Sequence, residues 1–267
     1  MLLPAIGIIG CMGGFMEYAG SLLETPPGTI LRSDSAVTPE EMLSALSEAD
    51  VVFLGEKHDD PLAHRWELFI WTRLAGSDRA LALEMFETDV QELLDGYLSG
   101  GVTREEFLEG SRPWSNYATD YSLMVEYARL KGYRVIAANV PRRFASDVAR
   151  DGWDALSDEE WFREVTVDSS DSGYRERFLE TMGIVGGQMH EMPMDPMNMY
   201  RAQSLKDAVM ARSVDGERCV FVCGSFHSDY RSGIPDQLAG GTTFLTVRML
   251  TDGEEYSPEL ADFVIVP

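Results

Sequence analysis

Histidine and carboxylate side chains follow several apolar segments of this sequence at the point where each segment ends. Glu56 and His58 follow the first of these segments, Glu84 ends the second, and His227 follows a later one. In an open parallel sheet, ligands bind just beyond the carboxyl ends of the strands. If the segments are parallel strands, the four side chains gather at one edge of the sheet, and we expect them to form a catalytic or binding site.

Two kinds of chemistry suit these four side chains. Histidine nitrogens and carboxylate oxygens are ligands of zinc and similar divalent ions, which leave one position for an activated water. The predicted metal ligands are then His58, His227, Glu56 and Glu84. Alternatively, His58 or His227 is a general base, and a carboxylate fixes the tautomer of its ring. The sequence does not decide between the two, because it contains no His-Glu-x-x-His motif.

Other chemical motifs are weak or missing. Ser225 lies in a Gly-Ser-Phe-His segment, which lacks the second glycine of a nucleophile elbow, and Cys223 is expected to be a buried strand residue. An acyl-enzyme mechanism is therefore not expected. His64 lies six residues after His58, a spacing that does not place both rings on one helical face. We expect His64 one to two turns into the next helix, near the rim of the pocket or on the surface.

The order of apolar and amphipathic segments predicts an α/β fold with a mostly parallel sheet. Thr38 starts a capping box, and helices are expected over 38–49, 61–75 and 120–131. Expected strands cover residues 51–54, 79–84, 134–139, 218–223, 243–248 and 262–266. About 75 residues separate the third of these strands from the fourth, too many for a simple crossover. We expect them to form a helical excursion that acts as a lid.

Two further segments offer an apolar surface to a ligand. Residues 189–199 contain five methionines. Three roles suit them: contact with a flat apolar ligand, ligation of Cu(I), or packing of the lid against the rest of the protein. Trp114, Tyr117 and Tyr121 form an aromatic patch that is either core or a wall for a large planar ligand. Of these, the phenol of Tyr121 is the group that could ligate iron.

Composition excludes some partners. The formal net charge of -23 opposes contact with nucleic acid. The sequence contains no run of about 18 apolar residues, so no transmembrane span is predicted. Residues 1–37 are interpreted as a leader or tail before a single domain over 38–267. Cys11 follows an apolar stretch in the manner of a lipoprotein signal, although residues 1–20 contain no Lys or Arg. The chain as it stands is predicted to be cytoplasmic, and the alternative is a lipid anchor on Cys11 outside the cytoplasm.

The motifs together resemble the ChaN-like haem-binding family, part of a wider group that includes Tiki and TraB proteins and erythromycin esterases. The resemblance covers about residues 38–250 and rests on several segments in order. They are VVFLGEKHDD at 51–60 with His64, LEMF at 83–86, Trp114, Asp120-Tyr121, IAANVP at 136–141, Lys206-Asp207 with Met210-Ala211, and GSFHSDY at 224–230.

The resemblance implies a three-layer α/β fold and a role in haem or iron acquisition, with haem bound through tyrosine at the interface of a homodimer. It gives Tyr121, and less directly Tyr230, as the iron ligand, and Lys57 and His64 as partners of the propionates. The wider group implies a hydrolase of ester or amide bonds instead, metal-dependent in Tiki-type relatives. A third possibility is a non-catalytic relative in which the polar side chains at the strand ends only form hydrogen bonds with one another.

Overall fold

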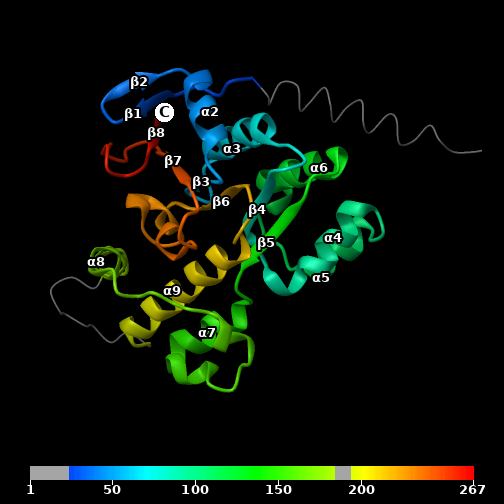
Figure 1. Ribbon diagram of the computed structural model, residues 1–267, viewed down its shortest axis with the longest axis vertical. Helices are drawn as coiled ribbons and strands as arrows, with labels where there is room; N and C mark the ends of the chain where they lie inside the picture. Colours follow the sequence, from blue (N-terminus) through cyan, green and yellow to red (C-terminus); the bar gives the residue numbers. More distant parts are fainter. Residues whose placement is uncertain (1–23, 184–193) are drawn as a thin grey trace, which may run out of the picture.

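A mostly parallel sheet forms the centre of the chain in the computed structural model, which describes residues 24–183 and 194–267 (Figure 1). Within these residues, the strands are β1 (Thr29–Arg32), β2 (Ser35–Val37), β3 (Val51–Glu56), β4 (Ala80–Glu87), β5 (Val135–Asn139), β6 (Cys219–Gly224), β7 (Phe244–Met249) and β8 (Phe263–Val266). Their order across the sheet is β2-β1-β8-β7-β3-β6-β4-β5. All pairings from β8 to β5 are parallel, and β1 is antiparallel to both of its neighbours.

Helices cover both faces of this sheet. They are α2 (Pro39–Glu48), α3 (Pro61–Leu74), α4 (Gln91–Ser99), α5 (Arg104–Ser111), α6 (Ser122–Lys131), α7 (Arg142–Asp151), α8 (Ser172–Thr181) and α9 (Pro196–Ser213). Successive strand residues point to opposite faces. In β3, Val52 and Leu54 belong to the core formed with α2 to α6, whereas Val51 and Phe53 belong to the core formed with α9. The three-layer α/β fold that the resemblance implies is therefore confirmed.

Local sequence signals explain where several helices begin and end. The Thr38 hydroxyl accepts a hydrogen bond from the Glu41 backbone N–H, and the Glu41 carboxylate accepts one from the Thr38 backbone N–H. This capping box starts α2 as expected, and such a cap contributes about 1 kcal/mol to the stability of the fold. Gly132 ends α6 in the left-handed region, with φ of 72°, which glycine adopts without steric cost.

The long segment between β5 and β6 is mostly helical where it is described, as predicted. Its α7 packs on α9 around a small core that includes Phe144, Val148 and Leu205. Figure 1 shows α7 beyond the ends of β4, β5 and β6, whereas α9 runs up to the sheet, where Met210 and Ala211 share a core with Val51 and Phe53. The methionine-rich stretch is described only from residue 194, so Met189 and Met192 lie outside the described residues.

Two features differ from the sequence-based expectation. The sheet begins at Thr29, before residue 38, because β1 and β2 form an antiparallel hairpin whose first strand pairs with β8. In addition, β4 continues to Glu87, with a register irregularity between Leu83 and Glu87, so Glu84 lies within this strand rather than at its end. Strands as short as β1 and β2 contain too few alternating positions to be recognised in the sequence.

Cys11 lies outside the described residues, and the predicted lipid anchor on it stays a prediction. Across 24–183 and 194–267, no helix combines the length and apolar character needed to cross a membrane.

Candidate functional site

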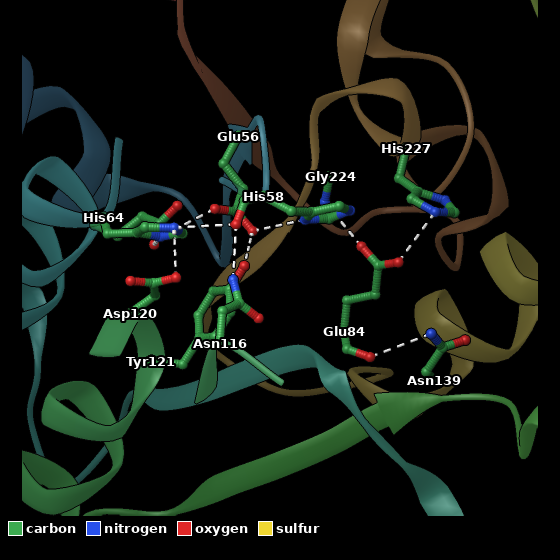
Figure 2. A network of polar contacts seen from close by, with 11 residues as sticks. Glu56, His58, His64, Glu84, Asn116, Asp120, Tyr121, Asn139, Gly224 and His227 are labelled. Carbon is green, nitrogen blue, oxygen red and sulfur yellow. Dashed lines mark hydrogen bonds and ion pairs between the residues drawn. The ribbon is translucent and has the colours of Figure 1, made fainter. Parts of the chain in front are cut away.

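The four side chains that the sequence singled out lie at or near the carboxyl ends of three neighbouring strands (Figure 2). Glu56 ends β3, and its register partner in β6 is Gly224, which directly precedes the turn that carries His227. Glu84 comes from β4, on the other side of β6. The parallel register therefore brings the carboxyl ends of β3, β6 and β4 together, as predicted from their order in the sequence.

Glu56 and His58 form the first histidine–carboxylate pair of the site. The Glu56 carboxylate is buried, and its Oε1 lies 2.9 Å from Nδ1 of His58. The His58 side chain is 44% exposed, and its ring lies edge-on to Trp114 with 4.6 Å between ring centroids. Partial burial lowers the pKa of His58, but the hydrogen bond to Glu56 and the charge of Glu84 raise it above its ordinary value. In this partly exposed side chain, Nδ1 is paired with Glu56, and Nε2, next to Gly224, is the nitrogen left to act as a proton acceptor or ligand.

His227 forms the second pair, with Asp207 of α9. The Nδ1 of His227 lies 2.5 Å from Oδ1 of Asp207, and its Nε2 lies 3.4 Å from Oε1 of Glu84. Burial lowers the pKa of His227, but the charges of Glu84 and Asp207 outweigh it and raise the pKa to about 10. Burial raises the pKa of Glu84, but the charge and hydrogen bond of His227 outweigh it and lower the pKa to about 2. The His227 ring is thus held as a cation between two carboxylates.

Gly224 allows the two pairs to lie so close. Its backbone N–H donates a 2.8 Å hydrogen bond to Oε2 of Glu84. A Cβ atom at this position would lie 2.8 Å from the His58 ring. Any side chain at residue 224 would therefore displace His58.

His64 is buried, which corrects the expectation of a rim or surface position. Asp60 caps α3 at its start, so His64 lies in the first turn and faces the strand ends. Its Nδ1 lies 3.1 Å from Oε2 of both Glu56 and Glu67, and its Nε2 lies 3.2 Å from the carbonyl oxygen of His58. Burial lowers the pKa of His64, but its bond to Glu67 and the neighbouring carboxylates raise it to about 9.

The two tyrosines and the lysine named as haem contacts lie in different environments. Tyr121 is buried, and its phenol donates a 2.6 Å hydrogen bond to Oε1 of Glu56. Burial and the Glu56 charge raise the pKa of this phenol far above its ordinary value. Tyr230 is 40% exposed and is covered on one face by Arg177. Lys57 is exposed next to His58 and lies 3.9 Å from Asp59.

Two adjoining cavities open beside the strand ends. The larger one, which we call the main cleft, has a volume of about 540 Å³, and the smaller one, the side cavity, of about 330 Å³. Both are lined by Phe178 and Met182 from α8 and its end and by Gln203 from α9, so the helical excursion roofs them. Glu84 lines the main cleft, and His58 and His227 line the side cavity.

Sequence reasoning missed two buried acids of the site. Asp207 lies within α9 among apolar residues, and Glu67 lies in α3 between Trp66 and Leu68. A carboxylate in the apolar part of a helix is costly unless it is paired, so its position was a usable signal. Burial and the charge of Glu56 raise the pKa of Glu67 to about 8.

The predicted metal set of His58, His227, Glu56 and Glu84 is not gathered into one compact ligand group. Among the described residues, the group of three or more such side chains with ligand atoms all within 4.8 Å of one another is Glu56, His64 and Glu67. Both histidines line the side cavity, each paired with its own carboxylate, Glu56 or Asp207. This arrangement suits acid–base chemistry by the four residues better than binding of one metal ion by all of them.

Sheet order, layers and site define this chain as a three-layer α/β protein with a histidine–carboxylate site at its strand ends. The chain belongs to the family described as haem-binding uptake, Tiki superfamily, ChaN, whose family model matches residues 42–238. The resemblance noted in the sequence is thereby confirmed. No curated protein sequence matches the chain significantly.

One solved structure supports the fold, and two others are more distant. A ChaN structure from Campylobacter jejuni, described as showing cofacial heme binding, is 20% identical with a TM-score of 0.74 and covers 90% of this chain and 96% of its own. The RRSP effector domain of a Vibrio vulnificus toxin is 18% identical with a TM-score of 0.45, covering 92% of this chain and 40% of its own. An erythromycin esterase mutant is 14% identical with a TM-score of 0.46, covering 91% of this chain and 83% of its own. The last two TM-scores are too low to carry an argument about function.

Proposed function

We propose that this protein binds haem in the main cleft and serves in haem or iron acquisition. The observation that carries the proposal is the lining of the cleft, in a chain that belongs to a haem-binding family. Its walls include the apolar side chains of Met85, Trp114, Phe178, Met182 and Met199. A flat, largely apolar macrocycle suits such a surface, because methionine adapts to irregular ligands and aromatic rings stack on planar ones.

The charged residues of the cleft suit the acidic groups of haem. Arg142 and Lys206 line the same cavity as the apolar walls, and guanidinium and ammonium groups are the usual partners of carboxylates. Lys57, which lines the side cavity, stays a second candidate for a propionate. His64 is less accessible for this role, because it is buried and both ring nitrogens already have partners.

The iron ligand is Tyr121 by resemblance, and this assignment requires a rearrangement. Its phenol is buried against Glu56 and lines neither cavity, so ligation needs the hydrogen bond to Glu56 to break. His58 is partly exposed and lines the side cavity, and it is the alternative ligand. Tyr230 lines neither cavity.

Titration of the purified protein with hemin tests the proposal by absorption spectroscopy. We expect a saturable Soret band, and a change of this band in Tyr121→Phe but not in the matched variant Tyr230→Phe identifies Tyr121 as the ligand. A change in His58→Ala alone assigns iron to His58. A wild-type spectrum equal to that of free hemin contradicts haem binding. Size-exclusion chromatography with and without hemin tests the homodimer that the resemblance implies.

A second candidate function is hydrolysis of an ester or amide bond, which the two histidine–carboxylate pairs favour. His58, oriented by Glu56, is placed to take a proton from a water in the side cavity. His227, held protonated by Asp207 and Glu84, is placed to donate a proton to the leaving group or to stabilise a developing oxyanion.

Turnover of a panel of p-nitrophenyl esters and anilides by haem-free protein tests this second function. We expect His58→Gln and His227→Gln to abolish turnover while the far-ultraviolet circular dichroism stays unchanged. Tyr230→Phe is the control and keeps full turnover. Absence of turnover in the wild-type protein, or equal turnover in both histidine variants, argues against hydrolysis.

A further inference from the structure

Three buried side chains form a group next to the two histidine–carboxylate pairs: Glu56, which also lines the side cavity, and His64 and Glu67, which line neither cavity. Glu56 comes from the end of β3, and His64 and Glu67 come from successive turns of α3. The two glutamate side chains are fully buried, and His64 is nearly so. Figure 2 shows His64 on one side of Glu56 and the pair of Glu84 and His227 on the other. The group is therefore separate from the second histidine–carboxylate pair.

The separations within this group match the spacing of ligands around a metal ion. The Nδ1 of His64 lies 3.1 Å from Oε2 of Glu56 and 3.1 Å from Oε2 of Glu67, and ligand atoms of all three residues lie within 4.8 Å of one another. Around an ion with bonds of about 2.1 Å, neighbouring ligand atoms are about 3.0 to 3.4 Å apart. One imidazole with two carboxylates is a ligand set of zinc and other divalent transition metals.

A buried oxygen without a partner points to a missing positive charge. Oε1 of Glu67 is buried and has no hydrogen-bond partner among the described residues, and the buried Oε2 of Glu56 faces His64 alone, at 3.1 Å from Nδ1. Buried carboxylates are paired with hydrogen-bond donors or coordinate metals, because their desolvation is costly. An imidazolium balances one ionised carboxylate and leaves Glu67 with its raised pKa, whereas a divalent cation balances two ionised carboxylates.

The hydrogen bonds around the group orient it for a cation. The Nε2 of His64 faces the carbonyl oxygen of His58 at 3.2 Å and Asp120 at 3.6 Å. A proton on Nε2 satisfies these acceptors and leaves the lone pair on Nδ1, the pattern of a metal-bound histidine. Tyr121 and His58 both bond to Oε1 of Glu56. Its second oxygen, Oε2, is left to face His64.

We propose that Glu56, His64 and Glu67 bind one divalent transition-metal ion of the Zn²⁺ or Mn²⁺ type. The ion occupies a structural position next to the side cavity and holds Glu56, which in turn orients His58. This site differs from the four-residue set expected from the sequence and shares with it Glu56 alone. It does not depend on haem binding or on hydrolysis.

Metal binding to the haem-free full chain tests the proposal. The protein is stripped with a chelator, dialysed against ZnCl₂ or MnCl₂, and analysed for bound metal by mass spectrometry and for affinity by calorimetry. We expect one equivalent of metal per chain and a higher midpoint of thermal unfolding on metal addition. Glu67→Gln keeps the shape of the side chain but removes a ligand charge, and we expect it to weaken binding at least tenfold and to abolish the thermal shift.

Glu84→Gln is the matched control, because Glu84 is also a buried glutamate at the strand ends but lies outside the group. We expect this variant to bind metal like the wild type. His64→Gln gives a second removal of a ligand if Glu67→Gln does not fold, as judged by circular dichroism. The proposal is overturned if the wild type binds no metal, if Glu84→Gln loses it equally, or if folded Glu67→Gln and His64→Gln both retain it.

Discussion

Replacement of Asp207 by asparagine tests whether the buried acid of α9 holds His227 as a cation. The variant keeps the size of the side chain but removes the charge that lies 2.5 Å from Nδ1 of His227. The pKa of His227, raised from 6.5 to about 10, sets an upper bound of about 5 kcal/mol for the whole interaction at about 1.4 kcal/mol per pKa unit. The lowered pKa of Glu84 expresses part of the same interaction and is not counted again.

Because Glu84 remains in the variant, we expect Asp207→Asn to lower the free energy of unfolding by about 2 to 3 kcal/mol near neutral pH, the range of a charged hydrogen bond. The folded-state pKa of His227 is raised, so its contribution to stability is fully present below the unfolded pKa of about 6.5. It is lost as the pH rises through about 10. The stability difference between wild type and variant therefore shrinks over this pH window.

Urea unfolding of both proteins from pH 6 to about pH 10.5 measures this difference, and other titrating groups cancel between them. Tyr174→Phe is the matched control, because the Tyr174 phenol donates a 2.7 Å hydrogen bond to the other oxygen of Asp207. We expect it to cost about 1 kcal/mol with no pH dependence in this window. Equal and pH-independent losses in the two variants would refute a buried His227 cation.

Three further substitutions test other parts of the structure. Gly224→Ala places a Cβ 2.8 Å from the His58 ring, so we expect a displaced ring, visible as a shifted His58 resonance in NMR, in a protein that still folds; an unmoved resonance contradicts the close approach. Arg79→Met removes donors to four backbone carbonyls and should lower the free energy of unfolding by about 3 kcal/mol. Arg218 is partly exposed, so Arg218→Met should lower the free energy of unfolding by less than Arg79→Met. Equal losses in the two variants would show that burial of the arginine does not matter. Thr38→Ala removes the capping box of α2 and should cost about 1 kcal/mol in urea unfolding, whereas no change would rule out a contribution from the cap.

Much of the fold could be predicted because its signals are local. Val51–Leu54 is continuously apolar because the strand is covered on both faces, and Thr38 and Gly132 mark helix ends through hydrogen bonds and backbone angles within a few residues. The clustering of Glu56 with His227 could also be predicted, since parallel strands deliver their carboxyl ends to one edge.

The rest of the site depends on contacts between residues distant in sequence. His64 is buried because α3 turns its first turn toward Glu56, an orientation that the spacing from His58 does not reveal. Asp207 meets His227 only because α9 returns across the strand ends after the excursion. Neither partner could be chosen from the sequence, although the position of an acid inside an apolar helix indicated that some partner exists.

Helix α9 belongs to two layers of the molecule at once. Gln203 and Lys206 line the main cleft, while Met210 and Ala211 farther along the same helix pack against the face of the sheet behind the site. Because protein interiors are close packed, one end of such a helix does not shift without the other. A ligand that moves the cleft end of α9 therefore also moves the end that packs on β3 and β6. We expect ligand binding in the cleft to change the geometry of the strand ends.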